Sequence, residues 1–154
     1  MRMLEVSFKD LKVGDVLERL SNRPANVQKS APVQEALNAM LANASSSQVY
    51  IIDQEGNLAG FLTTGTIIRL IGRRARDKES IALPFDRLLK EVGEMEVDVV
   101  MEKAMPVRRE TSLKVALDTM YEQHLDGVPV VDDDHKLIGE LTIVELFTSA
   151  KDVR

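Results

Sequence analysis

The chain has 154 residues, of which 44% are apolar and 29% are charged, and it carries a net charge of −5. This composition is ordinary for a soluble globular protein and excludes a disordered or collagen-like chain. The absence of cysteine excludes disulfides, thiol catalysis and thiolate metal sites. The mild acidity argues against a nucleic-acid or anionic-membrane binder, since these usually carry a basic surface.

We expect no signal peptide at the start of the chain. Residues 1–12 mix charged and apolar side chains and lack the apolar core of a signal peptide. No apolar run approaches the roughly 20 residues that span a bilayer. We therefore expect a cytoplasmic protein that has neither nucleic acid nor a membrane among its partners.

Two similar series of elements follow one another along the chain. A short helix is expected within residues 4–20. The first series has a strand, helix, strand, strand and helix at residues 25–29, 33–44, 49–53, 58–63 and 64–74. The second has the same elements at residues 105–109, 113–124, 128–132, 137–142 and 143–151. Between them, residues 75–96 are charged, with a possible short helix after Pro84.

The two series match each other in register. Their first helices have apolar residues at the same helical spacing, 80 residues apart, and the hairpins that follow match at an offset of 79. The identities at matched positions are Ala36/Ala116, Leu37/Leu117, Met40/Met120, Asp53/Asp132, Gly60/Gly139 and Thr63/Thr142. The sequence therefore predicts an α+β protein made of two β-α-β-β-α repeats. We expect an N-terminal helix with the first repeat at residues 1–74, a linker at 75–96 and the second repeat at 97–154.

The second repeat resembles a known family. Gly127-Val128-Pro129-Val130-Val131-Asp132 followed by Leu137-Ile138-Gly139-Glu140-Leu141-Thr142 is similar to the hairpin of a CBS domain. Asp98-Val99-Val100-Met101 resembles the usual lead-in to such a unit. The first repeat has the same pattern in Asp53 and Leu58-Ala59-Gly60-Phe61-Leu62-Thr63, and the resemblance covers residues 13–150.

The resemblance implies a tandem CBS pair, or Bateman module, whose two repeats pack about a pseudo-twofold axis. In many members a cleft between the repeats holds an adenine nucleotide or S-adenosylmethionine, and the module forms a disk-shaped homodimer. Such modules are regulatory rather than enzymatic and signal to a partner protein. No obligatory cofactor is implied. The alternative is a dimeric protein-interaction module whose clefts have lost the ability to bind a ligand.

The candidate ligand contacts lie after each return strand. The family pattern has a threonine or serine three residues before an aspartate, and the second repeat has Thr142 and Glu145 at these places. A carboxylate there can accept hydrogen bonds from both ribose hydroxyls. The first repeat has Thr63 and Thr66, without a carboxylate, so we expect tighter binding at Thr142 and Glu145. The alternative is that these residues only open a helix.

The resemblance also implies base-pocket residues. The cleft of Thr142 and Glu145 would use Ala25, Val27 and Val49, whereas the cleft of Thr63 and Thr66 would use Met105, Val107, Gly127 and Val128. The alternative for these residues is core or strand-end packing. Arg108 is a candidate phosphate contact. Asp126 stands where phosphate binders of the family often have a basic residue. This argues against phosphate binding and leaves nucleosides and S-adenosylmethionine as candidate ligands.

The remaining charged clusters favour structural interpretations. One basic cluster could bind an anion, but such a run more often forms a solvated helix end. It consists of Arg69, Arg73, Arg74, Arg76 and Lys78. Asp132-Asp133-Asp134-His135 lacks the glycine and glutamate spacing of a calcium loop and is expected to be a hairpin turn. His124 is expected to be partly buried. No nucleophile with a base and an acid is visible, so we expect neither a catalytic nor a metal site.

Overall fold

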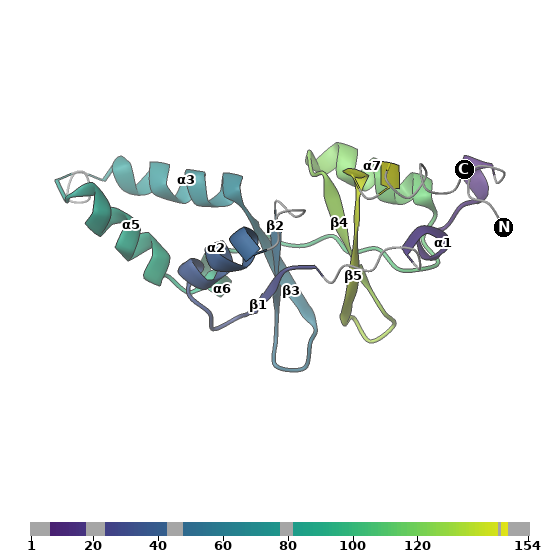
Figure 1. Cartoon of the computed structure of the whole chain (residues 1–154), viewed down its shortest axis with the longest axis horizontal. Helices are drawn as coiled ribbons and strands as arrows, with labels where there is room; N and C mark the ends of the chain where they lie inside the picture. Colours follow the sequence, from purple (N-terminus) through teal and green to yellow (C-terminus); the bar gives the residue numbers. More distant parts are fainter. Residues whose placement is uncertain (1–6, 18–23, 43–47, 78–81, 145, 148–154) are drawn as a thin grey trace. The chain divides into compact units, whose positions relative to one another are not determined.

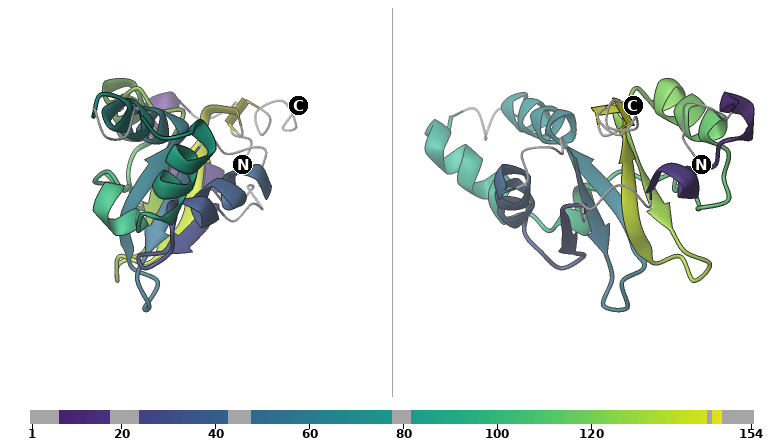
Figure 2. Two further views of the ribbon diagram at one scale, coloured as in Figure 1. Left: turned by 90° about the vertical axis from the view of Figure 1, so that its left-hand side faces the viewer. Right: turned by 45° about the vertical axis from the view of Figure 1, so that its right-hand side comes forward.

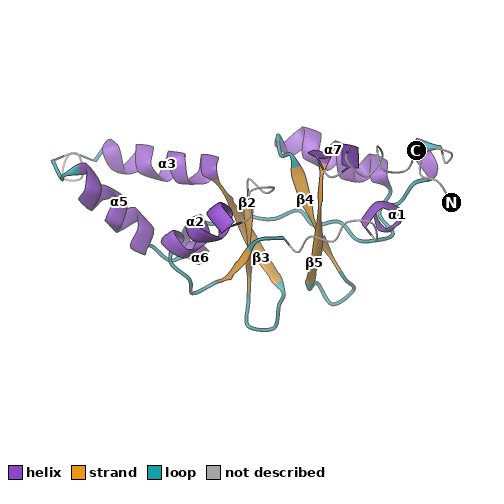
Figure 3. Ribbon diagram, viewed as in Figure 1, coloured by secondary structure: helices purple, strands orange, loops and turns teal. Residues whose placement is uncertain are grey.

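The computed structural model describes residues 7–17, 24–42, 48–77, 82–144 and 146–147 (Figure 1). The chain forms two compact units. One is Ala25–Ala104, and the other combines Met1–Pro24 with Met105–Arg154. Figure 3 shows that both units contain helices and strands, which confirms the expected α+β class.

The unit Ala25–Ala104 is built on a three-stranded sheet. Strand β1 lies parallel to β2, and β2 pairs with β3 in an antiparallel hairpin. Figure 2 shows the turn of this hairpin at the end of the sheet opposite α3. The elements are β1 (Asn26–Gln28), α2 (Val33–Ala42), β2 (Gln48–Ile52), β3 (Leu58–Thr63), α3 (Thr64–Ala75), α5 (Phe85–Glu94) and α6 (Val97–Val100).

The other unit has the same succession of a helix and a hairpin, preceded by two short helices from the N-terminal part of the chain. Its elements are η2 (Phe8–Asp10), α1 (Val13–Leu17), α7 (Leu113–Gln123), β4 (Gly127–Val131) and β5 (Leu137–Thr142). Strands β4 and β5 form an antiparallel hairpin, and Ile143, Val144, Leu146 and Phe147 continue from it in helical conformation. The predicted helices and hairpins of both repeats are thus confirmed within the described residues.

The second repeat departs from the expected pattern at its first strand. Residues 105–109 form only a single parallel bridge, between Val107 and Val130. In the first repeat, the N–H of Tyr50 donates to the carbonyl of Ala25 at 2.9 Å. The residue that matches Tyr50 is Pro129, which has no N–H to donate. This missing donor removes the ladder bond at the N-terminal end of the first strand of the second repeat.

Each unit has its own hydrophobic core, with the helices packed against one face of the sheet (Figure 1). In the unit Ala25–Ala104, Val49, Ile51 and Leu62 of the hairpin are fully buried with Val33 of α2. Helix α5 contacts α2 and α3 and adds Val92 to the same core. The helix expected after Pro84 is therefore confirmed, and part of the presumed linker is core structure.

The segments that lead into the repeats are exchanged between the units. Helix α1 precedes the first repeat in sequence, yet Val13, Val16 and Leu17 lie in the core of the second repeat's unit. Helix α6 opens the second repeat in sequence, yet Val97 lies in the core of the unit Ala25–Ala104. The compact units therefore follow other boundaries than the sequence repeats.

The glycine shared by both repeats is where these lead-in segments approach the hairpins. A Cβ on Gly60 would lie 2.7 Å from both the carbonyl oxygen of Glu102 and the sulfur of Met101. A Cβ on Gly139 would lie 2.9 Å from a methyl group of Leu17. Only a residue without a side chain allows the lead-in segment to pack this closely.

The last turn of the first helix in each repeat differs from the expected apolar face. His124 is exposed and ends α7 in the left-handed conformation, with φ of 55°, so the expectation of a partly buried histidine is wrong. Leu41 and Tyr121, at the matching place one turn earlier, are 83% and 82% exposed. These positions lie at the ends of helices α2 and α7, beyond the reach of the core.

No helix among the described residues has the length and apolarity needed to cross a membrane.

Candidate ligand site

The threonine pair of the first repeat lies where strand β3 passes into helix α3. Thr63 is the N-cap of α3, and its hydroxyl accepts a hydrogen bond from the N–H of Thr66 at 3.1 Å. In return, the Thr66 hydroxyl accepts the N–H of Thr63 at 3.3 Å. This reciprocal capping box satisfies two backbone donors at the start of the helix. The helix-opening role that the sequence suggested is therefore real.

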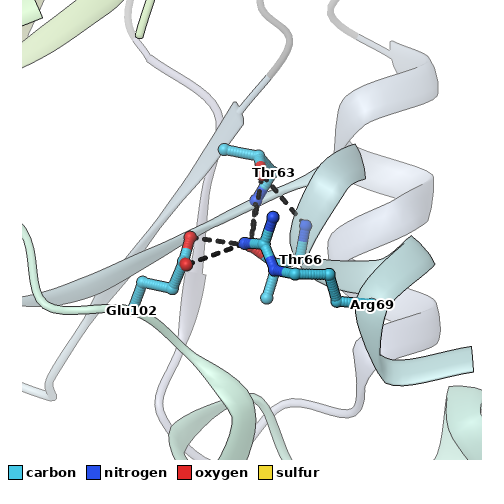
Figure 4. A network of polar contacts seen from close by, with 4 residues as sticks. All are labelled: Thr63, Thr66, Arg69 and Glu102. Carbon is cyan, nitrogen blue, oxygen red and sulfur yellow. Dashed lines mark hydrogen bonds and ion pairs between the residues drawn. The ribbon is translucent and has the colours of Figure 1, made fainter. Parts of the chain in front are cut away.

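The same two threonines belong to a larger polar network, which Figure 4 shows. Thr66 donates its hydroxyl proton to Glu102 Oε2 at 2.8 Å, and Arg69 donates to Glu102 Oε1 at 2.8 Å. The side chains of Arg69 and Glu102 are 55% and 40% exposed, so the ion pair is open to solvent. Exposed pairs of this kind contribute little stability, about 0–1 kcal/mol.

The backbone of Glu102 is fixed to the hairpin. Its N–H donates to the carbonyl of Phe61 at 2.9 Å, and its carbonyl accepts the N–H of Phe61 at 3.0 Å. These two bonds place the carboxylate beside the end of β3 and the start of α3. The first-repeat threonine pair therefore has a carboxylate after all, supplied from 36 positions further along the chain.

Sequence reasoning missed Glu102. The expectation of tighter binding at Thr142 and Glu145 depended on a carboxylate being absent from the first pair, and Glu102 lies beside that pair. The expectation stays a prediction. One signal was available, because Glu102 directly follows the lead-in motif that ends at Met101. Nothing in the sequence, however, indicated which hairpin this lead-in segment contacts.

The second-repeat pair is described only in part. Thr142 ends strand β5, pairs with Gly127 in the hairpin and is 7% exposed. The N–H of Ile143 donates to the carbonyl of Asp126 at 3.0 Å, which fixes the start of the following helical turn. Glu145 lies outside the described residues, so its predicted role stays a prediction.

The other predicted contacts divide into core and surface residues. Val27 and Val49 lie in the core of the unit Ala25–Ala104, with Ala25 packed against it. Val107 and Val128 lie in the core of the other unit, Gly127 is buried, and Met105 is 49% exposed. Arg108 is exposed, and its guanidinium lies 3.4 Å from Asp133. The valine side chains therefore pack in the cores, as the structural alternative expected. Each predicted cleft draws on both units, and both groupings stay predictions.

The aspartates that follow β2 and β4 organise hairpin turns. Asp53 accepts hydrogen bonds from the N–H groups of Asn57 and Glu55, each at 2.9 Å. The bond from Asn57 contributes most to lowering the pKa of Asp53 below its ordinary value. Asp132 accepts the N–H groups of Asp134 and Lys136 in the same way. The expected turn at residues 132–135 is thus confirmed.

The basic residues of α3 have different surroundings. Arg69 is paired with Glu102, and Arg74 lies 3.9 Å from Glu91 and contacts the sulfur of Met95. Arg73 and Arg76 are exposed near the end of the helix. Lys78 lies outside the described residues. Within the described part of this cluster, only Arg69 lies near the threonine pair.

Comparison with known proteins assigns the family. The CBS-domain family model matches residues 12–73 and 92–152. A homoserine O-acetyltransferase of Methanocorpusculum labreanum is 22% identical over 87% of this chain, but this chain spans only 24% of that enzyme's length. The chain spans about a quarter or less of the length of the curated relatives it matches.

Two solved structures share the fold. One is CBSX2 in complex with AMP, which is 24% identical, with a TM-score of 0.68 over 93% of this chain and 98% of that one. The other is a CBS-domain pair in complex with 5′-methylthioadenosine and S-adenosylmethionine, 19% identical, with a TM-score of 0.65 over 93% and 98%. With both repeats matched by the family model, the chain belongs to the CBS-domain family and contains two CBS domains.

Proposed function

We propose that this chain is a non-enzymatic regulatory module that binds an adenosine-containing ligand, in the class of AMP, ADP, ATP or S-adenosylmethionine, and signals to a partner protein. The observation that carries the proposal is the cluster of Thr63, Thr66 and Glu102, which offers a charged acceptor to a ribose. The AMP and S-adenosylmethionine complexes of proteins with this fold support the ligand class. A cytoplasmic location is part of the same proposal.

The proposed mechanism is a shift between conformations. A ligand can shift an equilibrium only by the difference between its affinities for the two states. The backbone of Glu102 pairs with β3 while its side chain accepts a hydrogen bond from α3, so a ligand at this carboxylate would bind where three segments of one unit meet. The partner would then bind one of the two states more tightly.

Thermal unfolding in the presence of AMP, ADP, ATP and S-adenosylmethionine tests the proposal. A ligand that binds only the folded chain stabilises it by about 2.7 kcal/mol at 100 times its Kd. For a chain of this length we expect the Tm to rise by roughly 5–10 °C. GMP serves as the matched control for the base. If none of the adenosine ligands raises the Tm, the chain is better explained as a ligand-free interaction module.

We also propose a homodimer that forms through the closing helices of the two repeats. Among the apolar residues of these helices, Ile67 and Leu146 are core residues. Ile68 and Phe147 remain 68% and 72% exposed, and they occupy the same register position in the two repeats. Large apolar side chains exposed at matched positions favour a symmetric protein contact.

Sedimentation velocity at micromolar concentration tests the dimer. The wild-type protein should sediment as a dimer, with twice the chain's mass of 17.2 kDa. The double substitution Ile68→Asp and Phe147→Asp should shift it to the monomer, since burying two new charges at an interface is costly. Val99→Asp is the control, because Val99 is 73% exposed on α6, which is not one of the two closing helices. A wild-type monomer, or a dimer that both variants leave intact, contradicts this interface.

A further inference from the structure

A polar pocket lies at the end of the first-repeat sheet that is opposite α3. Its volume is about 360 Å³, and it belongs wholly to the unit Ala25–Ala104. One wall is the turn between β1 and α2, and the other is the hairpin turn between β2 and β3, which Figure 2 shows. The lining residues are Gln28, Lys29, Ser30, Asp53, Gln54 and Glu55.

This pocket is separate from the threonine pair. Strand β3 begins at Leu58, beside the pocket's hairpin turn, and ends at Thr63, where α3 starts. A strand of this length holds its two ends roughly 15–20 Å apart. A ligand in the pocket would therefore occupy a different site from an adenosine ligand at Thr63 and Thr66.

Backbone hydrogen bonds hold both walls of the pocket in place. The N–H of Lys29 donates to the carbonyl of Ile52 at 3.0 Å, which fastens the first wall to the end of β2. In the second wall, Asp53 Oδ1 accepts the N–H groups of Glu55 and Asn57, each at 2.9 Å. The pocket is therefore formed before any ligand binds, and binding requires little further ordering of the chain.

The second repeat has an ion pair at the matching place. Gln28 of the first wall matches Arg108 in the repeat register, and Gln54 of the second wall matches Asp133. The guanidinium of Arg108 lies 3.4 Å from the carboxylate of Asp133. In the first repeat two neutral amides stand at these positions, so the same ion pair cannot cross the pocket.

The two walls of the pocket carry opposite charges. Lys29 lies on the first wall, and Asp53 and Glu55 lie on the second. The hydrogen bond from Asn57 does most to lower the pKa of Asp53, and the charge of Lys29 adds to this effect. No carboxylate of the described residues forms an ion pair with the Lys29 ammonium. A cation facing anions across a pocket is complementary to a small molecule that carries both charges.

We propose that this pocket binds a free α-amino acid with a small polar side chain, with the ligand's carboxylate at Lys29 and its ammonium group at Asp53. The amides of Gln28 and Gln54 and the hydroxyl of Ser30 supply donors and acceptors for the rest of the molecule. The lining offers no aromatic or aliphatic side chain to a nucleobase. The inference is independent of the proposed function, because the pocket and the threonine pair lie at opposite ends of β3.

A titration of the full chain with L-serine, followed by ¹H–¹⁵N NMR, tests the proposal. The backbone amide signals of Ser30, Gln54 and Glu55 should shift and saturate, whereas that of Thr66 should stay in place. N-acetyl-L-serine lacks the ammonium charge, and L-serinamide lacks the carboxylate. Each should bind about fivefold more weakly than L-serine, which is the effect of losing one exposed charge pair.

Two variants and a matched control examine the pocket itself. Lys29→Gln should weaken L-serine binding about fivefold. The double substitution Gln28→Arg and Gln54→Asp transfers the ion pair of the second repeat to the first and should abolish binding. Lys90→Gln, which removes the same charge from an exposed position on α5, should leave the affinity unchanged. Unaltered amide signals elsewhere in the unit show that each variant is folded, and Lys29→Gln alone decides if the double variant is not.

Three results would overturn the proposal. The first is an L-serine titration that leaves the amides of the pocket unmoved. The second is equal affinity for L-serine and N-acetyl-L-serine, which would make the pocket a site for simple anions. The third is a Lys29→Gln variant that binds L-serine as tightly as Lys90→Gln does. None of these results bears on the thermal shifts with adenosine ligands, so the proposed function is tested separately.

Discussion

Replacing Gly60 by alanine should destabilise the chain by about 1–3 kcal/mol, which is the usual cost of overpacking. The new methyl group would meet the carbonyl oxygen of Glu102 at 2.7 Å. That oxygen cannot turn aside, because it accepts the N–H of Phe61 at 3.0 Å. Either this bond breaks or the segment at Glu102 moves away from β3. Thermal denaturation should show a Tm lower by roughly 5 °C.

Two other glycines provide matched controls for this substitution. Gly139→Ala meets only the methyl end of Leu17, at 2.9 Å, and a side chain can adjust more cheaply than a backbone carbonyl. Its cost should be clearly smaller. Gly72→Ala, within α3, meets nothing within 4 Å and should stabilise the helix by about 0.5–1 kcal/mol. Equal Tm values for Gly60→Ala and Gly139→Ala would contradict the close approach of Glu102 to β3.

The elements of the fold follow from local patterns in the sequence. Helical spacing predicted α2 and α7, and short apolar runs with a shared glycine predicted both hairpins. The capping residues Thr63 and Ser112 mark the starts of α3 and α7. The effect of Pro129 is also local, because a proline has no N–H to donate to the neighbouring strand. Such features depend on residues that lie close together in the sequence.

The candidate site depends on a contact that no local pattern contains. Thr66 and Glu102 are 36 positions apart and belong to different sequence repeats. The repeat pattern gives the order of the elements in each repeat, but it does not say that α6 packs with the first hairpin rather than the second. For the same reason, the position of α1 in the core of the second repeat's unit could not be predicted from the repeats.

The exchanged lead-in segments predict how the chain responds to being cut. A cut after residue 82 would separate Val92 and Val97 from the core of the unit Ala25–Ala104. It would also separate Val13, Val16 and Leu17 from the core of the other unit. Domains of about 60 residues bury only about 60% of their unfolded surface and have little stability to lose. We expect neither of the fragments 1–82 and 83–154 to fold.

A fragment cut at the boundaries of the compact unit should behave differently. Residues 25–104 retain α5, α6 and Glu102, together with the hydrogen bonds from Val33 to Met95 and from Val97 to Ala31, at 2.8 and 2.9 Å. Circular dichroism during heating should show a cooperative transition for this fragment and a gradual change for fragment 1–82. Fragment 1–82 is the matched comparison, because it contains the whole first repeat and is similar in length. A cooperative transition in fragment 1–82 at the same temperature would mean that the sequence repeat, rather than the compact unit with its exchanged lead-in helix, is the folding unit.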